Sequence, residues 1–260
     1  EIFNLRNNWG RTALSDALCY SRKDIFRILL DLDADPTISD NFGNTALHLA
    51  IYKSFGADLI SMIIDAAMQQ IINNLGQNGM TDPCRDRDIV REEMLKFINS
   101  RDRRGRSALH LAFEFQDFPV ETVKILLKHD ADPRIPDNNG KTALDRAIQK
   151  EQHDAITEIV NAVRNMPKLH FLQNGMTPPL YSGSINRSKH HHLPSGIISV
   201  IFTDDMIKQW KRSAENALKW AMSTKRDDLV DSLKIICDDI TETGQPIDSS
   251  KQLPSVVNDC

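Results

Sequence analysis

The residues that could bind a metal ion or act as nucleophiles are the 8 histidines and 4 cysteines of this 260-residue chain. His190, His191 and His192 are consecutive, and Lys189 and His170 precede them. Imidazole nitrogen and thiolate sulfur are ligands that zinc prefers, so this run is the first metal candidate. Three adjacent side chains in a stretch rich in Ser, Gly and Asn do not point at one centre, however. We therefore expect a solvated loop here, with no metal ion and no other cofactor.

Cys84 or Cys237 could supply a thiolate ligand to such a metal site. Cysteine chemistry is the second candidate, as a Cys–His nucleophilic pair in the C-terminal third of the chain. The sequence Ile-Ile-Cys-Asp-Asp around Cys237 places two acids beside the thiol. Neighbouring carboxylates raise the pKa of a thiol and weaken it as a nucleophile. We also find no glycine-rich phosphate-binding loop and no His-Glu-x-x-His motif. We expect no catalytic residue and a protein that is not an enzyme.

Charge is distributed unevenly along the chain. Residues 85–106 carry 8 basic and 5 acidic side chains, with the densest cluster at Arg101–Arg106, whereas residues 227–260 carry 8 acidic and 2 basic side chains. A solvated face is the simplest interpretation of the basic cluster, an acidic protein partner is the next, and nucleic acid is the last because no aromatic residues are interleaved there. The net charge of −4 argues against a generally basic surface for nucleic acid or anionic membrane.

Cysteine spacing and hydropathy indicate the compartment. The four cysteines show no paired spacing of a disulfide framework, so we expect the reducing cytoplasm, which would be a host cytosol if the protein is a secreted effector. No segment reaches the 18 or so apolar residues of a membrane span, and we expect a monomer without one. The chain begins with Glu1, and Phe3–Gly10 already reads as one unit running into the next, so we expect a fragment.

A repeated motif organises the rest of the sequence. Gly-x-Thr-Ala-Leu begins at Gly10, Gly43 and Gly140, and Gly-x-Ser-Ala-Leu begins at Gly105. The first two glycines are 33 residues apart, and the last two are 35 apart. A fixed period of this size is typical of a solenoid built from stacked copies of one small unit.

Each motif is followed by apolar residues at helical spacing. In the first unit, Ala13–Leu18 carries one apolar stripe, Ser21–Asp24 is a polar break, and Ile25–Leu30 carries a second stripe. Pro36 disfavours helical geometry at the preceding residue and closes the unit at Asp33–Pro36. The pattern predicts a helix, a tight turn and a second helix.

These residues resemble ankyrin repeats. The resemblance rests on Thr-Ala-Leu-His-Leu-Ala at Thr45–Ala50, Ser-Ala-Leu-His-Leu-Ala at Ser107–Ala112, and Asp-Ala-Asp-Pro at Asp33–Pro36 and Asp130–Pro133. Alanine replaces the proline usual in the family, at little cost because alanine is the best helix former. The resemblance implies an all-α, ankyrin-type α-solenoid of helix-turn-helix repeats with short hairpin fingers. It also implies that His48 and His110 are structural and tie the Thr or Ser to the turn.

The spacing of the motif predicts where each repeat unit and each domain begins. Residues 1–165 are predicted to be an ankyrin array with units near 10, 43, 79, 105 and 140. The unit near 79 is degenerate: Asn78–Thr81 restores the phase, its first helix is at most one turn, and its second helix fits Asp88–Leu95. Residues 166–240 are predicted to hold a degenerate repeat with an inserted loop, beginning at Gly175, and a capping repeat from about 214. Residues 241–260 are predicted to be a flexible tail.

The resemblance places partner-binding residues at the finger tips and at the ends of the first helices. The expected contact residues are Trp9, Arg11, Tyr20, Phe42, Asn44, Tyr52, Lys53, Arg103, Arg104, Arg106, Glu114, Phe115, Asn138, Asn139 and Lys141. Trp, Tyr, Phe and Arg dominate interface energies. Trp9, Phe42 and Phe115 are therefore the strongest candidates, although each could instead pack on a neighbouring finger.

We expect a protein–protein interaction module that binds a partner protein through its concave face, as an effector, an adaptor or a scaffold. Two alternatives remain open. One is an enzyme or enzyme-linked effector with its catalytic region outside this fragment or in the C-terminal third. The other is an inhibitor of a transcription factor, since arrays of six or seven ankyrin units also resemble that class. Fold alone does not decide among them.

Overall fold

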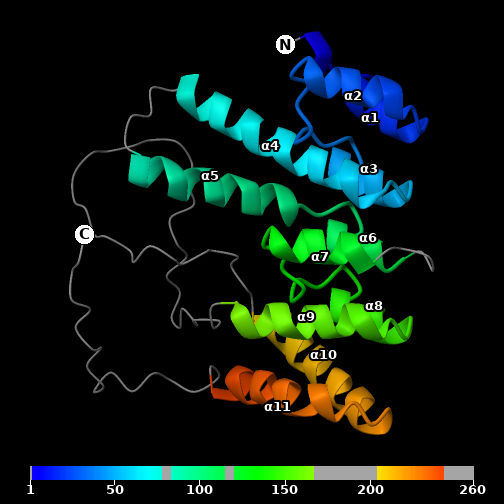
Figure 1. Ribbon diagram of the computed structural model, residues 1–260, viewed down its shortest axis with the longest axis vertical. Helices are drawn as coiled ribbons and strands as arrows, with labels where there is room; N and C mark the ends of the chain where they lie inside the picture. Colours follow the sequence, from blue (N-terminus) through cyan, green and yellow to red (C-terminus); the bar gives the residue numbers. More distant parts are fainter. Residues whose placement is uncertain (1, 78–82, 115–119, 167–203, 243–260) are drawn as a thin grey trace.

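The computed structural model describes residues 2–77, 83–114, 120–166 and 204–242, and these form two rows of α-helices (Figure 1). The first-helix row consists of α1 (Ala13–Cys19), α3 (Ala46–Tyr52), α6 (Ala108–Ala112), α8 (Ala143–Gln149) and α10 (Asp204–Ser223). The second-helix row consists of α2 (Lys23–Asp31), α4 (Ala57–Gln77), α7 (Val120–Lys128), α9 (His153–Asn165) and α11 (Asp227–Glu242). A short 3-10 helix (Ile2–Asn4) precedes α1, and α5 (Pro83–Ile98) packs on α4. Successive helices of the first row are in contact, as are those of the second row from α4 onward. An ion pair between Arg27 and Asp58 links α2 to α4.

Capping explains why the first helices begin where they do. Thr45, Ser107 and Thr142 stand at the N-caps of α3, α6 and α8, each in a capping box closed by the residue three positions later. Such caps satisfy backbone N–H groups that have no partner inside the helix, and each contributes about 1 kcal/mol. The Leu of every motif is then buried to 1% exposure or less: Leu14, Leu47, Leu109 and Leu144. The repeated motif therefore sets both the start of each helix and its contribution to the core.

The segment between the second and third motifs differs from the prediction. Residues 83–98 form one continuous helix, longer at both ends than the predicted Asp88–Leu95. Pro83 is well suited to the first helical position, and Met94, Phe97 and Ile98 give α5 a buried stripe that packs with α4. Residues 78–82, where the predicted unit would begin, lie outside the described residues.

Among the described residues, the turns at Gly43 and Gly105 are direct neighbours in space. The backbone N–H of Arg103 donates directly to the carbonyl oxygen of Phe42 at 2.8 Å, and α3 contacts α6. The α4–α5 pair instead projects beyond the ends of the neighbouring helices (Figure 1). Sequence period alone could not show this, because the extension of α4 and the additional helix α5 together add a length close to one repeat between the two motifs.

The last described helices close the stack. Trp210 in α10 is 1% exposed, and Arg212 donates from Nη2 to the carbonyl oxygen of Gly140 at 2.9 Å. The first half of α10 thus lies against the turn at Gly140, which is the fourth turn. In an array with one more repeat, the next turn would occupy this place. The degenerate unit expected at Gly175 lies outside the described residues, and α11 extends to Glu242, two residues into the predicted tail. The division of residues 166–260 into repeat, cap and tail remains a prediction.

Four turns between paired helices contain a non-glycine residue in the left-handed region: Ser21, Ser54, Glu151 and Lys225, with φ of 54° to 56°. This conformation costs an L-residue about 1–2 kcal/mol, whereas glycine adopts it freely. We expect Glu151→Gly and Lys225→Gly each to raise the free energy of unfolding by about 0.5–1 kcal/mol in urea titrations, after the greater chain entropy of unfolded glycine is deducted. Lys150→Gly, at a φ of −94°, is the matched control and should not stabilise. A gain at Lys150 equal to that at Glu151 would contradict the strain argument.

Among the residues that the structure covers, no helix is long and apolar enough to cross a membrane.

Candidate functional site

Each repeat motif is preceded by a turn that folds around one polar side chain, which is buried in the last three turns and exposed in the first. Oδ1 of Asp40, Asp102 and Asp137 accepts the backbone N–H groups two and four residues later, at 2.8 to 2.9 Å. Asn7 does the same in the first turn for Trp9 and Arg11. The glycine of each turn has φ between 70° and 79°, in the left-handed region. These bonds fix the direction in which the remaining side chains of the turn point.

Neighbouring turns are hydrogen-bonded into one continuous row. The N–H of Asn41 donates to the carbonyl oxygen of Trp9 (2.9 Å), and the N–H of Asn138 donates to that of Arg104 (2.9 Å). The corresponding Arg103–Phe42 bond joins the middle pair. We call residues 6–11, 40–44, 101–106 and 137–141 the turn row. Its tips are held at a fixed spacing because the contacts are between backbones.

Two buried histidines link this row to the helices. His48 bonds through Nδ1 to Oγ1 of Thr45 (2.9 Å) and through Nε2 to the carbonyl oxygen of Arg106 (3.2 Å). His110 repeats the arrangement with Ser107 (2.9 Å) and the carbonyl oxygen of Lys141 (3.1 Å). A carbonyl oxygen can only accept, so Nε2 carries the proton in both rings. The structural role predicted for the two histidines is confirmed.

The electrostatics of these buried groups favour a neutral imidazole beside an ionised aspartate. Burial lowers the pKa of His48, and it lowers that of His110 to about 4. Burial alone would raise the pKa of Asp137, but the N–H of Lys141, the guanidinium of Arg146 and the N–H of Asn139 together hold it below its usual range. Neither histidine is therefore poised to exchange protons near neutral pH.

Aromatic side chains are exposed along the turn row and at the ends of the first helices. Trp9 is 58% exposed and Phe42 43%, on adjacent turns; Tyr20 and Tyr52, which end α1 and α3, are 70% and 53% exposed. The guanidinium of Arg103 lies 5.0 Å from the centre of the Phe42 ring. Arg104, Asn139, Lys141 and Lys53 are also exposed. The structure thus presents these predicted contact residues to solvent on neighbouring turns and helix ends.

Other predicted contact residues are held within the scaffold. Arg11 lies 3.8 Å from Asp40 and 3.9 Å from Asp16, and Arg106 pairs with both Asp102 and Glu114. Asn44 donates to the carboxylate of Asp40, and Asn138 donates from Nδ2 to the carbonyl oxygen of Arg103. Phe115 lies outside the described residues. Participation of these side chains in partner binding remains a prediction.

Arg6 and Arg101 were not among the predicted residues. Each stands four positions before a turn glycine and donates from Nε to the carbonyl oxygen of that glycine, Gly10 or Gly105, at 2.9 Å. Arg101 also donates to the carbonyl oxygen of Pro136 (2.9 Å). The shared Arg-x-x-x-Gly spacing is the signal that could have identified both.

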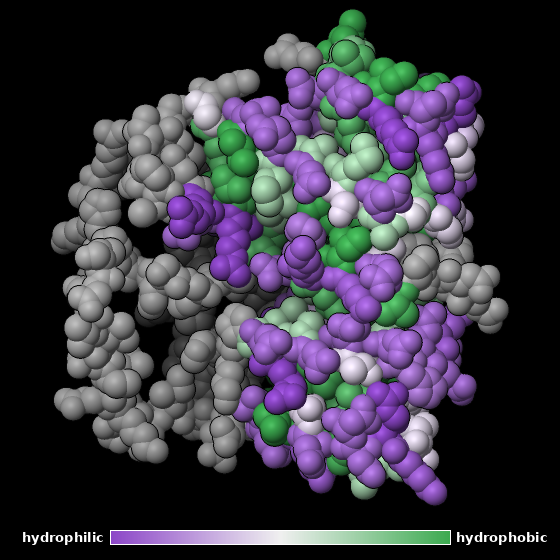
Figure 2. Space-filling view, in the orientation of Figure 1, coloured by the Kyte–Doolittle hydropathy of each residue, from purple (hydrophilic) through white to green (hydrophobic). Residues whose placement is uncertain are grey.

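Large apolar side chains are exposed mainly in the first unit. Figure 2 shows this hydrophobic surface gathered at the N-terminal end of the stack. Ile25, the third residue of α2, is 38% exposed, whereas Thr122 and Ala155, the third residues of α7 and α9, are fully buried. The faces through which units stack are apolar, so the exposure at this end reflects its position in the stack.

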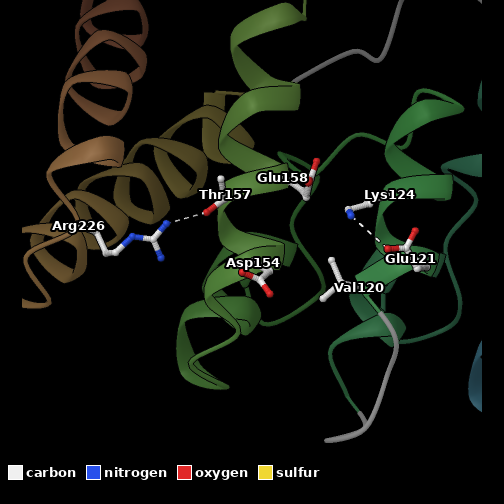
Figure 3. A pocket seen from close by; sticks show the side chains of 7 residues that line it. All are labelled: Val120, Glu121, Lys124, Asp154, Thr157, Glu158 and Arg226. Carbon is white, nitrogen blue, oxygen red and sulfur yellow. Dashed lines mark hydrogen bonds and ion pairs between the residues drawn. The ribbon is translucent and has the colours of Figure 1, made fainter.

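A polar groove lies on the second-helix side, between α7, α9 and the start of α11 (Figure 3). It has a volume of about 380 Å³ and is lined by Val120, Glu121, Lys124, Asp154, Thr157, Glu158 and Arg226. Lys124 pairs with Glu121 (3.1 Å), and Arg226 donates to Oγ1 of Thr157 (3.0 Å). Its lining holds neither Cys nor His.

The environments of the described cysteines, Cys19 and Cys237, do not favour a nucleophilic thiolate. Burial raises the pKa of Cys19, and burial with Glu215 and Asp238 raises that of Cys237. Within the described parts of the chain, no three His, Cys, Asp or Glu side chains come together as a metal site. His170 and the run His190–His192 lie outside those parts.

The chain belongs to the ankyrin-repeat family. A family model described as ankyrin repeats (3 copies) matches residues 1–74 and 64–168. Such repeats are generally protein-interaction modules and are typically non-catalytic.

Individual relatives share the repeats at low identity. Neurogenic locus notch homolog protein 1 from Homo sapiens is 30% identical over 156 residues, which are 55% of this chain and 6% of that protein. Inversin from Homo sapiens is 29% identical over 157 residues, 58% of this chain and 14% of that protein. A crystal structure of an ankyrin repeat domain from Acinetobacter baumannii has a TM-score of 0.46 and 20% identity, covering 63% of this chain and 70% of that one. The chain thus spans a small part of the length of the first two relatives.

Proposed function

We propose that this chain binds a partner protein through one face, formed by the tips of the turn row and the C-terminal ends of α1 and α3. The observation that carries the proposal is the exposure of Trp9, Phe42, Tyr20 and Tyr52 on turns and helix ends that are otherwise fixed by hydrogen bonds. Aromatic side chains on a rigid surface supply contact area at low entropic cost, and they dominate interface energies.

Rigidity supports recognition without covalent chemistry. The turns are internally bonded through Asp40, Asp102 and Asp137, and they are joined to one another through their backbones. Binding therefore requires little ordering of the surface, which is the general advantage of a preorganised site. An adaptor, scaffold or effector role would use the same face.

The enzyme and transcription-factor-inhibitor alternatives have no described residue in their favour.

Cys19 and Cys237 are free thiols, which supports a reducing compartment such as the cytoplasm. We further propose that the chain acts as a monomer, with the partner on the turn-row face.

The proposal predicts the result of a capture experiment with the double variant Trp9→Ala/Phe42→Ala. The backbones of both residues hold the turns, and their side chains are exposed, so the fold should be retained by circular dichroism. We expect the Kd for a partner isolated with the wild-type chain to rise at least about tenfold, since interface aromatics often contribute more than 1 kcal/mol each.

The matched control is Met222→Ala/Ile235→Ala, which removes exposed apolar side chains from α10 and α11. It should bind the partner as the wild type does. Equal binding by all three proteins would show that the interface lies elsewhere.

A further inference from the structure

The turn row contains buried acids and exposed bases. The carboxylates of Asp40, Asp102 and Asp137 are its only acidic groups, and these residues are 3%, 8% and 4% exposed. Each has an arginine beside it: Arg11 at 3.8 Å, Arg106 at 2.7 Å and Arg146 at 2.5 Å, respectively. The negative charges are therefore used within the fold and are not presented at the surface.

Acids on the adjoining first helices are engaged as well. Asp16 accepts from Nδ2 of Asn7, Glu114 pairs with Arg106, and Asp145 accepts from Thr142 and Ser213. Asp16 and Glu114 offset the charges of Arg11 and Arg106, and none of the three acids forms an ion pair with Arg103, Arg104 or Lys141 at the turn tips.

The basic side chains of the row are only partly neutralised. The row carries seven basic and three acidic residues, whereas the chain as a whole carries a net charge of −4. Arg6 and Arg101 donate to carbonyl oxygens of the backbone, which leaves their positive charge uncompensated. Arg103, Arg104 and Lys141 form no ion pair with any carboxylate of the described residues. Excess positive charge thus lies on a surface whose geometry is fixed.

The second-helix side of the molecule has the opposite character. Its groove is lined by three acidic and two basic side chains. Helix α11 carries 6 acidic residues and 1 basic residue. A negatively charged partner would be attracted to the turn row and repelled from the second-helix side.

From this arrangement we infer that the turn row takes an extended, acidic segment of a partner protein, a conclusion that rests on the proposed function. Carboxylates of the segment pair with the guanidinium groups of Arg103 and Arg104, which suit planar carboxylates. Apolar side chains of the segment lie against Trp9 and Phe42. The guanidinium of Arg103 lies 5.0 Å from the centre of the Phe42 ring, so the charged and the apolar contacts of the segment would be adjacent.

A selection experiment tests the chemistry of the partner directly. Random 12-residue peptides displayed on phage are selected on the immobilised full chain, with counter-selection on Arg103→Glu/Arg104→Glu. We expect the selected peptides to be enriched in Asp and Glu. Their synthetic forms should bind the wild type at least about tenfold more tightly than the charge-reversed variant and should weaken between 50 and 200 mM salt.

The control Lys219→Glu/Lys225→Glu makes the same change in net charge at the other end of the chain and should bind as the wild type does. Arg103→Gln/Arg104→Gln should give an intermediate loss. Neutral or basic selected peptides, equal binding by the charge-reversed variant, or no enrichment over it would each overturn the inference. If a single-stranded dT20 oligonucleotide binds more tightly than the selected peptides, and the charge-reversed variant loses this binding, the ligand of the turn row is nucleic acid and the inference is wrong.

The two proposals fail in different ways. If Trp9→Ala/Phe42→Ala abolishes partner capture while Arg103→Glu/Arg104→Glu does not, the proposed binding face is supported and the inference of an acidic partner segment is wrong. If neither variant changes capture, the proposed binding face itself is wrong.

Discussion

Replacing Gly105 with alanine should lower the free energy of unfolding by about 3 kcal/mol. Gly105 has a φ of 75°, and an added Cβ would lie 2.7 Å from the backbone nitrogen of Asn138, with the side-chain oxygen of that residue closer still. The left-handed conformation alone costs alanine about 1–2 kcal/mol. Relief of the clash also breaks the bond from Asn138 N–H to Arg104, and each lost hydrogen bond costs about 0.5–1.5 kcal/mol.

Urea denaturation of the full chain measures this effect, and Gly76→Ala is the matched control. Gly76 lies in the last turns of α4, and a Cβ added there would meet nothing within 4 Å. Alanine is the better helix former, so this substitution should be neutral or slightly stabilising. Similar losses at both positions would show that the contact between turns does not determine the cost at Gly105.

Lowering the pH from 7 to 4.5 should destabilise the fold by roughly 2–3 kcal/mol through His110 alone. The pKa of its imidazole is about 4 in the folded chain, from the ordinary value of 6.5, chiefly because of burial. Between these values the unfolded chain binds a proton that the folded chain does not, so stability falls as the pH falls. Each pKa unit corresponds to 1.36 kcal/mol. His48, whose pKa burial also lowers, adds to the loss in the same direction.

Urea titrations at pH 7.5, 6.0, 5.0 and 4.5 measure this dependence in the wild type and in His110→Asn. The variant is less stable at pH 7.5, because it loses the bond to the carbonyl oxygen of Lys141. It has no imidazole to protonate at this position, so its deficit relative to the wild type should shrink as the pH falls. A deficit that stays constant from pH 7.5 to 4.5 would show that protonation of His110 does not contribute.

Rigid turns connect these stability effects to binding. Gly105 and His110 fix the backbone of the turns that carry Arg103, Arg104 and Lys141. Substitutions at the first two residues should therefore weaken partner binding as a secondary effect of misplaced turns. Stability should be measured beside affinity in every variant of the binding face.

Much of the fold could be predicted from the sequence because the determining interactions are local. The motif around Thr45–Ala50 supplies an N-cap, a buried leucine and a histidine within one helical turn. These features recur at Ser107–Ala112, so the repeat, the all-α fold class and the structural role of the histidines could all be predicted from the sequence. The exposure of the aromatic side chains Trp9 and Phe42 could also be predicted from the sequence, because turn tips project from the stack.

The tertiary structure alone decided which units are neighbours and which side chains are available. Helix α5 lies in sequence where a degenerate repeat was expected, yet α3 packs on α6 and the backbones of the two flanking turns are bonded directly to each other. Likewise, Arg106 pairs with Asp102 and Glu114 while Arg103 and Arg104 stay exposed, although all three arginines belong to one basic run. Residue type and period determine local structure, whereas the charge that a surface presents depends on which carboxylates the fold brings beside each cation.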